Sequence, residues 1–180
     1  VRLGPLTREL SPGTVLYPND IMSLSVVQQN LGRRPIVWAV TAGRGFAGLG
    51  DYVVQKGLGF HLRIALPDTT DPSLNLKRLA SAPLDIPTTE TLVYDAYRYA
   101  DLLKEGSADL DPTAQSAASS LALPFVQLVY AYQGRGPDAR QRMQRALDHA
   151  AKLSPNPELR QALLQLIQAP PESSGPTLQE

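Results

Sequence analysis

The sequence predicts an α+β fold, in which a small α/β region over residues 1–87 packs against an antiparallel helical region over residues 88–168. Three observations favour this class. Two apolar segments of strand length lie in the first region, separated by a glycine-rich loop. Apolar residues of the second region recur with the period of an α-helix. Finally, 43% of the residues are hydrophobic and the 17 basic and 17 acidic residues balance, which is typical of a globular chain with a buried core.

The first region begins with an extended stretch that is followed by a helix. Three prolines within residues 1–18 exclude a continuous helix there. Asn19 suits the N-cap position because its side chain can accept a hydrogen bond from the first helical turn. Asp20 suits the positive end of the helix dipole. We therefore expect a helix from there to about residue 30.

A strand–helix–strand unit is predicted next. Residues 36–40 form a continuous apolar run, typical of a strand buried on both faces, and Trp38 is expected in the core. Residues 49–56 suit a short helix that Gly57 ends. Apolar and polar residues then alternate over residues 60–65, as in a strand with one solvated face. This order predicts parallel pairing of the two strands through a right-handed crossover.

The second region contains four successive apolar stripes with helical spacing, between residues 92 and 167. Such stripes predict helices that pack side by side. Pro112 and Pro137 suit the first helical position, where the missing amide hydrogen costs no intrahelical bond. Pro124 lies inside the second stripe and is expected to kink that helix.

Two further segments are expected to lack regular structure, and the composition excludes some chemistry. Residues 68–87 contain three prolines and are predicted to form a loop, and residues 169–180 have the composition of a disordered tail. The chain has no cysteine, which excludes disulfides, thiolate catalysis and zinc–thiolate sites. No apolar run reaches the roughly 20 residues that a membrane-spanning helix needs.

The glycine-rich loop and its surroundings carry the candidate ligand contacts. Three arginines near the end of the first strand would form an anion site, and the alternative is that they are solvated surface residues. Two side chains on the short helix are expected to face the loop, although Asp51 also suits a structural role at the helix start. The candidate ligand or partner contacts are Arg33, Arg34, Arg44, Phe46, Asp51 and Tyr52.

Nucleotide binding is an alternative function of the same loop. Residues 43–48 match the pattern G-x-G-x-x-G, which binds a phosphate at a helix N-terminus, and Asp68 lies about 20 residues further on. Against it, the following helix is short, Phe46 is bulky, and one strand–helix–strand unit does not form the required crevice. We expect no cofactor. We also expect no metal site, because His61 and His149 lack partners with ligand spacing. The spacing indicates no catalytic triad or carboxylate pair.

Residues 121–157 resemble one tetratricopeptide unit, in which two antiparallel helices are joined by a short turn. Tetratricopeptide arrays need about three repeats to be stable, so we expect these helices to pack against the α/β region as well. The positions that carry the resemblance are Phe125, Leu128, Tyr132, Gly134, Ala139, Ala146, Leu147 and the closing Leu153-Ser154-Pro155-Asn156.

A longer resemblance covers most of the chain. Residues 30–66 read NLGRRPIVWAVTAGRGFAGLGDYVVQKGLGFHLRIAL. This segment resembles the block RPI-apolar-aromatic-A, LGL-x-x-Y and GL-x-(Y/F)-x-L near the C-terminal end of a large bacterial family of multi-spanning membrane proteins of unknown function. That family is related to the transmembrane protein O-mannosyltransferases, GT-C-type glycosyltransferases with tetratricopeptide-like C-terminal helices. The helical segment follows the block in the order that the family shows.

The resemblance implies that the chain is a non-catalytic extracytoplasmic region of a larger protein at the periplasmic face of a bacterial inner membrane. The parent would move a sugar from a polyprenyl phosphate, with its catalytic acids in an N-terminal transmembrane region. The implied partners are that transmembrane region and a protein or glycan acceptor. We expect no nucleic-acid binding and no direct membrane insertion by this chain. A tetratricopeptide-type interaction scaffold unrelated to sugar transfer is the main alternative.

Overall fold

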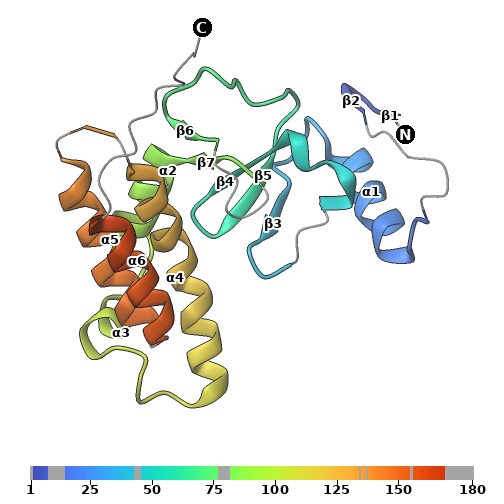
Figure 1. Ribbon diagram of the computed structural model, residues 1–180. Helices are drawn as coiled ribbons and strands as arrows, with labels where there is room; N and C mark the ends of the chain where they lie inside the picture. The colour runs from blue at the N-terminus through green and yellow to red at the C-terminus, as the bar shows by residue number, and fades with distance from the viewer. Residues whose placement is uncertain are drawn as a thin grey trace, which may run out of the picture. The chain divides into compact units, whose positions relative to one another are not determined.

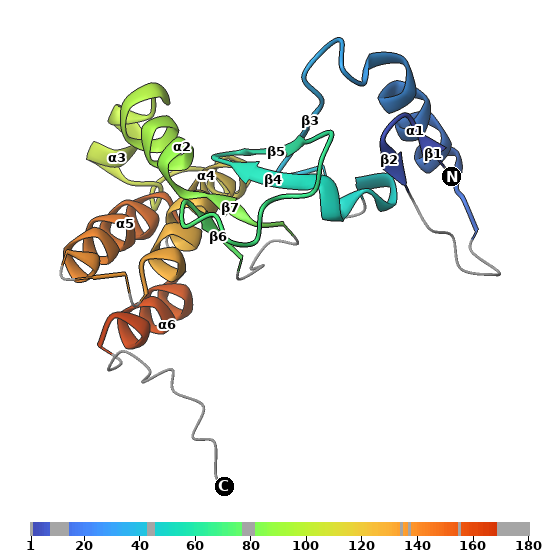
Figure 2. The same ribbon diagram turned by 90° about the horizontal axis from the view of Figure 1, so that it is seen from above.

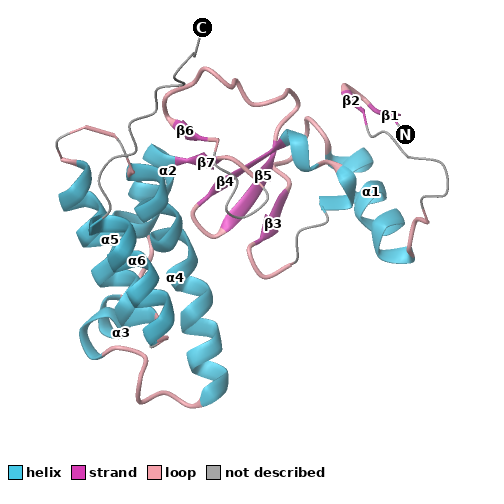
Figure 3. Ribbon diagram, in the orientation of Figure 1, coloured by secondary structure: helices cyan, strands magenta, loops and turns pink. Residues whose placement is uncertain are grey.

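The computed structural model describes residues 2–7, 15–42, 46–76, 82–133, 135–136, 138–154 and 156–168. The predicted tail at residues 169–180 lies outside these ranges. The chain divides into two compact units, Val1–Tyr97 and Arg98–Glu180. The first unit contains a mixed β-sheet, and the described elements of the second are helices (Figures 1 and 3). The α+β class is therefore confirmed.

Helix α1, Pro18–Asn30, confirms the first predicted helix. It begins one residue before Asn19, and Tyr17 occupies the N-cap position. The carboxylate of Asp20 accepts a 3.1 Å hydrogen bond from the Tyr17 amide, which satisfies a donor at the positive end of the helix.

The predicted parallel strand–helix–strand unit is wrong. Strand β3 covers Val37–Ala39, and two 3₁₀ turns, η1 at Phe46–Gly48 and η2 at Gly50–Tyr52, follow it. Strand β4, Val53–Lys56, then occupies the second half of the predicted helix. Strand β5, Gly59–Leu62, pairs antiparallel with both β4 and β3. The three strands thus form an antiparallel group without a crossover.

Side-chain shape and turn geometry explain this difference. Val53 and Val54 are β-branched, which favours strand over helix, and the sheet buries both completely. Gly57 has φ +54°, so residues 57–58 form a tight turn between β4 and β5 rather than a helix end. Val37 is 46% exposed because β3 lies at an edge of the sheet and is not buried on both faces.

Two short strands complete the five-stranded sheet. Strand β6 covers Leu74–Asn75 and strand β7 covers Leu84–Asp85, so the predicted loop over residues 68–87 contributes to the sheet. The strand order is β3-β5-β4-β7-β6. The β4–β7 pairing is parallel and the other three pairings are antiparallel.

The first unit extends about one helix beyond the expected boundary at residue 87. Helix α2, Ile86–Thr91, continues into the π-helical turn Leu92–Ala96, and the unit ends at Tyr97. The Asp85 side chain caps α2 by accepting a 3.0 Å hydrogen bond from the Thr88 amide.

Two apolar clusters contribute to the core of the first unit. In one, Leu24 and Val27 of α1 pack with the small hairpin of β1, Arg2–Leu3, and β2, Leu6–Thr7. The other contains Phe46, Val53, Phe60 and Ala82. Trp38, predicted as core, is half-buried and packs against both clusters.

The second unit contains four described helices. They are α3 at Ala100–Glu105, α4 at Pro112–Tyr132, α5 at Ala139–Leu153 and α6 at Pro157–Gln168. Helix α5 contacts α3, α4 and α6 (Figure 2). Helix α4 runs through the buried Pro124.

The predicted helices are confirmed where a capping residue marks the helix start and an apolar stripe marks its buried face. Asp111 accepts hydrogen bonds from the amides of Thr113 and Ala114, so Pro112 occupies the first helical position as predicted. Helix α5 begins at Ala139, two residues after the proline expected to start it. The predicted stripes of α4 and α5 are buried except for Leu121, which is half-buried. The buried members are Phe125, Leu128, Val129, Tyr132, Ala139, Met143, Ala146, Leu147 and Ala150. The first stripe is wrong as one helix, because residues 97–99 are non-helical and separate two helical segments.

A candidate ligand-binding groove

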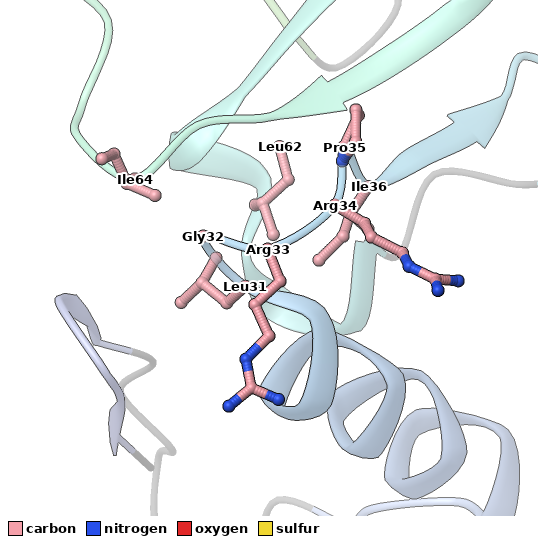
Figure 4. Close-up of a pocket in the computed structure, with 8 residues that line it drawn as sticks. All are labelled: Leu31, Gly32, Arg33, Arg34, Pro35, Ile36, Leu62 and Ile64. Atoms are coloured by element: carbon pink, nitrogen blue, oxygen red, sulfur yellow. The ribbon is translucent and has the colours of Figure 1, made fainter.

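The connection between α1 and β3 lines a surface pocket of about 310 Å³. Residues 31–36 form one side, and Leu62 and Ile64 form the other (Figure 4). Both sides belong to the first unit. Two of the six candidate contacts, the adjacent arginines, lie in this pocket.

The end of α1 positions these arginines. The Asn30 carbonyl oxygen accepts hydrogen bonds of 2.9 Å from the Arg33 amide and 3.0 Å from the Arg34 amide. Gly32 has φ +74°, which allows the chain to turn directly after the helix. Pro35 then restricts Arg34 to an extended conformation and directs the chain into β3. The backbone around both arginines is therefore well defined.

Both guanidinium groups are exposed, and they point away from Leu62 in Figure 4. No described acidic residue forms an ion pair with Arg33 or Arg34. They follow the C-terminus of α1, whose partial negative charge favours cations there. This position accounts for a basic residue but leaves the hydrogen-bond donors of both groups available to a carboxylate.

A second, apolar groove of about 300 Å³ adjoins this pocket, and Ile36 lines both. One wall is α1 and the other is β3. Within it, Met22 is 70% exposed and Val26 is 55% exposed. The residues that line the groove are Met22, Ser23, Val26, Val27, Ile36, Val37 and Trp38.

The apolar groove was not predicted from the sequence. Its signal is the presence of apolar residues on two faces of α1: Leu24 and Val27 point into the core, whereas Met22 and Val26 do not. An amphipathic surface helix normally has one apolar face. The helix alone does not reveal which face the rest of the chain covers.

The other four candidate contacts lie elsewhere. Arg44 is outside the described residues. Phe46 is 4% exposed and packs edge-to-face against Trp38 and Phe60, with ring centroids 5.8 and 4.9 Å away. Asp51 is exposed on η2. The Tyr52 hydroxyl accepts a 3.4 Å hydrogen bond from the backbone of β2, so this side chain joins the small hairpin to the sheet.

The glycine pattern at residues 43–48 lacks the structural context of a dinucleotide site. Its first three residues are outside the described ranges. Phe46 and Ala47, which belong to η1, have φ values of +41° and +50°, and only the short turn η2 separates η1 from β4. A phosphate-binding motif of this kind depends on an α-helix at that position, whose amides and dipole bind the anion.

A polar cluster on the β4–β5 hairpin was also not predicted. Lys56 Nζ lies 3.3 Å from Asp85 Oδ2, an ion pair between adjacent strands. His61 lies near both groups. Burial and the Lys56 charge lower the pKa of His61 from 6.5, and the Asp85 charge partly opposes this shift. Because Asp85 also caps α2, the cluster connects the sheet to that helix.

Comparison of the chain with protein-family models, with curated proteins and with solved structures finds no match. Over the residues that the structure describes, no helix is long and apolar enough to cross a membrane. The same residues include no group of three or more acidic or histidine side chains arranged around a metal position.

Proposed function

We propose that this chain is a non-catalytic binding region of a membrane-embedded, glycosyltransferase-like protein at the periplasmic face of a bacterial inner membrane. The observation that carries the binding role is the pair of exposed arginines beside an apolar groove, without acidic partners among the described residues. The sugar-transfer context rests on the resemblance of residues 30–66 to the membrane-protein family. The parent would take its sugar from a polyprenyl phosphate.

The proposed partners are the transmembrane region of the parent and a protein or glycan acceptor. In this arrangement the chain holds the acceptor, or stabilises the parent, while the catalytic acids belong to the membrane part. Its balanced charge supports neither nucleic-acid binding nor attraction to an anionic bilayer.

We further propose that α4 and α5 form a tetratricopeptide-like antiparallel pair. The buried positions on both helices agree with that repeat, although α4 has 21 residues and exceeds a repeat helix in length. Considered without the membrane-protein resemblance, the α4–α5 pair favours a second candidate function. This is a protein-interaction scaffold without any role in sugar transfer.

Two measurements test the proposal, and the second separates it from the scaffold. Incubating the purified chain with a polyprenyl-phosphate sugar and acceptor peptides should give no product, and turnover by the chain alone would overturn the non-catalytic role. The complete reading frame should encode several apolar spans before this chain. A reading frame without such spans would exclude the membrane context and favour the scaffold.

The binding role is tested in the full-length protein. Replacing both Arg33 and Arg34 by alanine should raise KM for the acceptor about tenfold and leave kcat unchanged, because charged hydrogen bonds to the acceptor are lost before the chemical step. Arg140→Ala, an exposed arginine on α5, is the matched control and should change neither constant. A fall in kcat with unchanged KM would contradict acceptor binding.

A further inference from the structure

We propose that the groove between α1 and the free edge of β3 binds an extended peptide, which adds a strand to β3 and places an acidic side chain beside Arg33 and Arg34. This inference rests on the proposed function and specifies its ligand class. Three independent features of the first unit support it: the hydrogen-bonding edge, the apolar walls and the charge at one end.

The edge of β3 has a defined hydrogen-bond direction. Ile36 accepts a 3.0 Å hydrogen bond from the Leu62 amide, and the Val40 amide donates one of 3.0 Å to Leu58, so these residues face β5. Backbone groups alternate in direction along an antiparallel strand. The amides of Val37 and Ala39 and the Val37 carbonyl therefore point outward, away from β5. No described strand pairs with this edge.

Residues of α1 and of β3 line this groove together. The exposed Met22 and Val26 of α1 form one apolar wall, and Val37 and Trp38 form the other. A strand that pairs with β3 would place its side chains alternately beside Val37 on one face of the sheet and beside Trp38 on the other. Peptide recognition by strand addition uses this combination, in which main-chain bonds give affinity and side-chain pockets give specificity.

Charge selects the occupant. The apolar groove meets the arginine pocket at Ile36, so a chain lying along β3 passes Arg33 and Arg34 near the start of the strand. An acidic side chain there would form charge-assisted hydrogen bonds with groups that have no described acidic partner. A groove with apolar walls and a basic end therefore matches an apolar peptide with Asp or Glu at one end.

Other occupants account for fewer of these features. A helix docked in the groove would leave the outward amides of β3 without partners. A second copy of this chain would pair the two β3 edges, but β3 contains no acidic residue that could bind the arginines of the other copy. Both occupants are distinguished by the experiment below.

Fluorescence anisotropy with defined probes tests the charge requirement. The probes are fluorescein-labelled octapeptides with blocked termini, which alternate valine and threonine and carry two glutamates at either the first or the last positions. At least one should bind, and replacing its glutamates with lysines should weaken binding about tenfold or more. The double variant Arg33→Ala/Arg34→Ala should remove this preference, and Arg140→Ala should retain it. Equal binding of the glutamate and lysine probes, or binding of neither glutamate probe, would overturn the proposal.

Backbone methylation tests strand addition directly. In the binding probe, N-methylation of one alternate set of amides should abolish binding, and methylation of the other set should preserve it, because only one set faces β3. Ala39→Pro should weaken binding about tenfold by removing an outward donor, with an unchanged circular dichroism spectrum showing that the fold is retained. Equal sensitivity of both methylated sets would indicate a helix or nonspecific adsorption and would reject strand addition.

The oligomeric state distinguishes a bound peptide from a second copy of this chain. The chain should be monomeric by light scattering at the concentrations used. Val37→Asp should weaken probe binding, and the variant should have the same molar mass in solution as the natural chain. A dimer that Val37→Asp dissociates would assign the groove to self-association and overturn the peptide proposal. Failure of the probes combined with a raised acceptor KM in the full-length arginine variant would reject only the peptide as ligand, and the proposed function would stand.

Discussion

The amide of Leu58 donates a 3.0 Å hydrogen bond to the hydroxyl of Tyr97, a residue 39 positions further along the chain. The neighbouring Gly57 amide donates a 3.0 Å hydrogen bond to the Thr89 hydroxyl. Two side chains from α2 and the segment after it thus hold the turn of the β4–β5 hairpin. These bonds explain why the first unit extends to Tyr97 rather than ending at residue 87.

We predict that Gly57→Ala and Tyr97→Phe are destabilising and energetically coupled. A Cβ at Gly57 would overlap the Tyr97 hydroxyl and lie 3.1 Å from Leu92, and the φ of +54° is strained for alanine. Gly57→Ala should lower the free energy of unfolding by about 1–3 kcal/mol. Tyr97→Phe removes one hydrogen bond and should cost about 1 kcal/mol. Urea unfolding of both single variants and the double variant measures these costs.

The coupling has a definite sign. Removing the Tyr97 hydroxyl creates space for the new methyl group, so the double variant should be less destabilised than the sum of the single variants. A strictly additive result would show that the strain comes from the backbone of Gly57 alone.

We predict that His61 makes the chain less stable as the pH falls below about 6.5. Burial and Lys56 lower its pKa in the folded state, whereas Asp85 opposes this change. The unfolded chain therefore binds the proton more tightly. The contribution is fully favourable above pH 6.5, and it decreases between that value and the lower pKa of the folded state.

The measurement compares unfolding free energies at pH 7.5 and 5.5 for the natural chain and for His61→Gln. The variant should lose part of the pH dependence in this window, and the His61 ring protons should titrate below pH 6.5 in NMR spectra. The lowered pKa values of Asp68 and Asp71 act near and below their ordinary value of 3.8, outside this window. A His61 titration above 6.5 would reverse the predicted sign.

The sequence predicts the helical half better than the sheet, for physical reasons. Local signals determine α4 and α5, because the Asp111-Pro112 cap and the apolar stripes operate within a few residues. In contrast, the partner of a four-residue strand is chosen by packing far away in the sequence. Residues 49–56 have an apolar spacing compatible with a helix, and the burial of Val53 and Val54 overrides it.

The sequence predicted the arginines of the candidate site, but it did not predict the parts that depend on long-range packing. The sequence predicted Arg33 and Arg34 as ligand contacts beside the first strand, and both line the pocket. Phe46 is next to the glycine loop in sequence, but its ring packs between Trp38 and Phe60. The apolar groove depends on which face of α1 the hairpin β1–β2 covers, and the helix sequence does not contain that information.

We predict that Asp85 contributes more to stability than its ion pair with Lys56. The pair is partly exposed, so Lys56→Met should cost less than about 1 kcal/mol. Asp85→Ala also removes the cap of α2 and should cost about 1–2 kcal/mol. Asp85→Asn keeps a capping oxygen, so its cost in stability should lie between those of Lys56→Met and Asp85→Ala. Thermal and urea unfolding at neutral pH rank these variants, and a larger effect of Lys56→Met would show that the pair dominates.

Ser107 closes the C-terminus of α5, and its replacement should be selectively destabilising. Its amide donates a 3.0 Å hydrogen bond to the Lys152 carbonyl, and its hydroxyl donates one of 2.9 Å to the Leu153 carbonyl. Ser107 is 1% exposed and Leu153 is fully buried, so water does not replace the lost donor in Ser107→Ala. We expect a cost of about 1–3 kcal/mol, because a buried acceptor is left without its partner.

Ser120→Ala is the matched control for this prediction. The Ser120 hydroxyl donates a 3.2 Å hydrogen bond to the Ser116 carbonyl one turn earlier in α4, an exposed bond within the same helix. That carbonyl lies within the regular helix, and alanine has the higher helix propensity, so the substitution should be neutral or slightly stabilising. Hydrogen exchange should locate the difference: Ser107→Ala should accelerate exchange in the last turn of α5, and Ser120→Ala should not. Equal effects of the two variants would show that loss of a hydroxyl, rather than loss of the α5 closure, determines the change in stability.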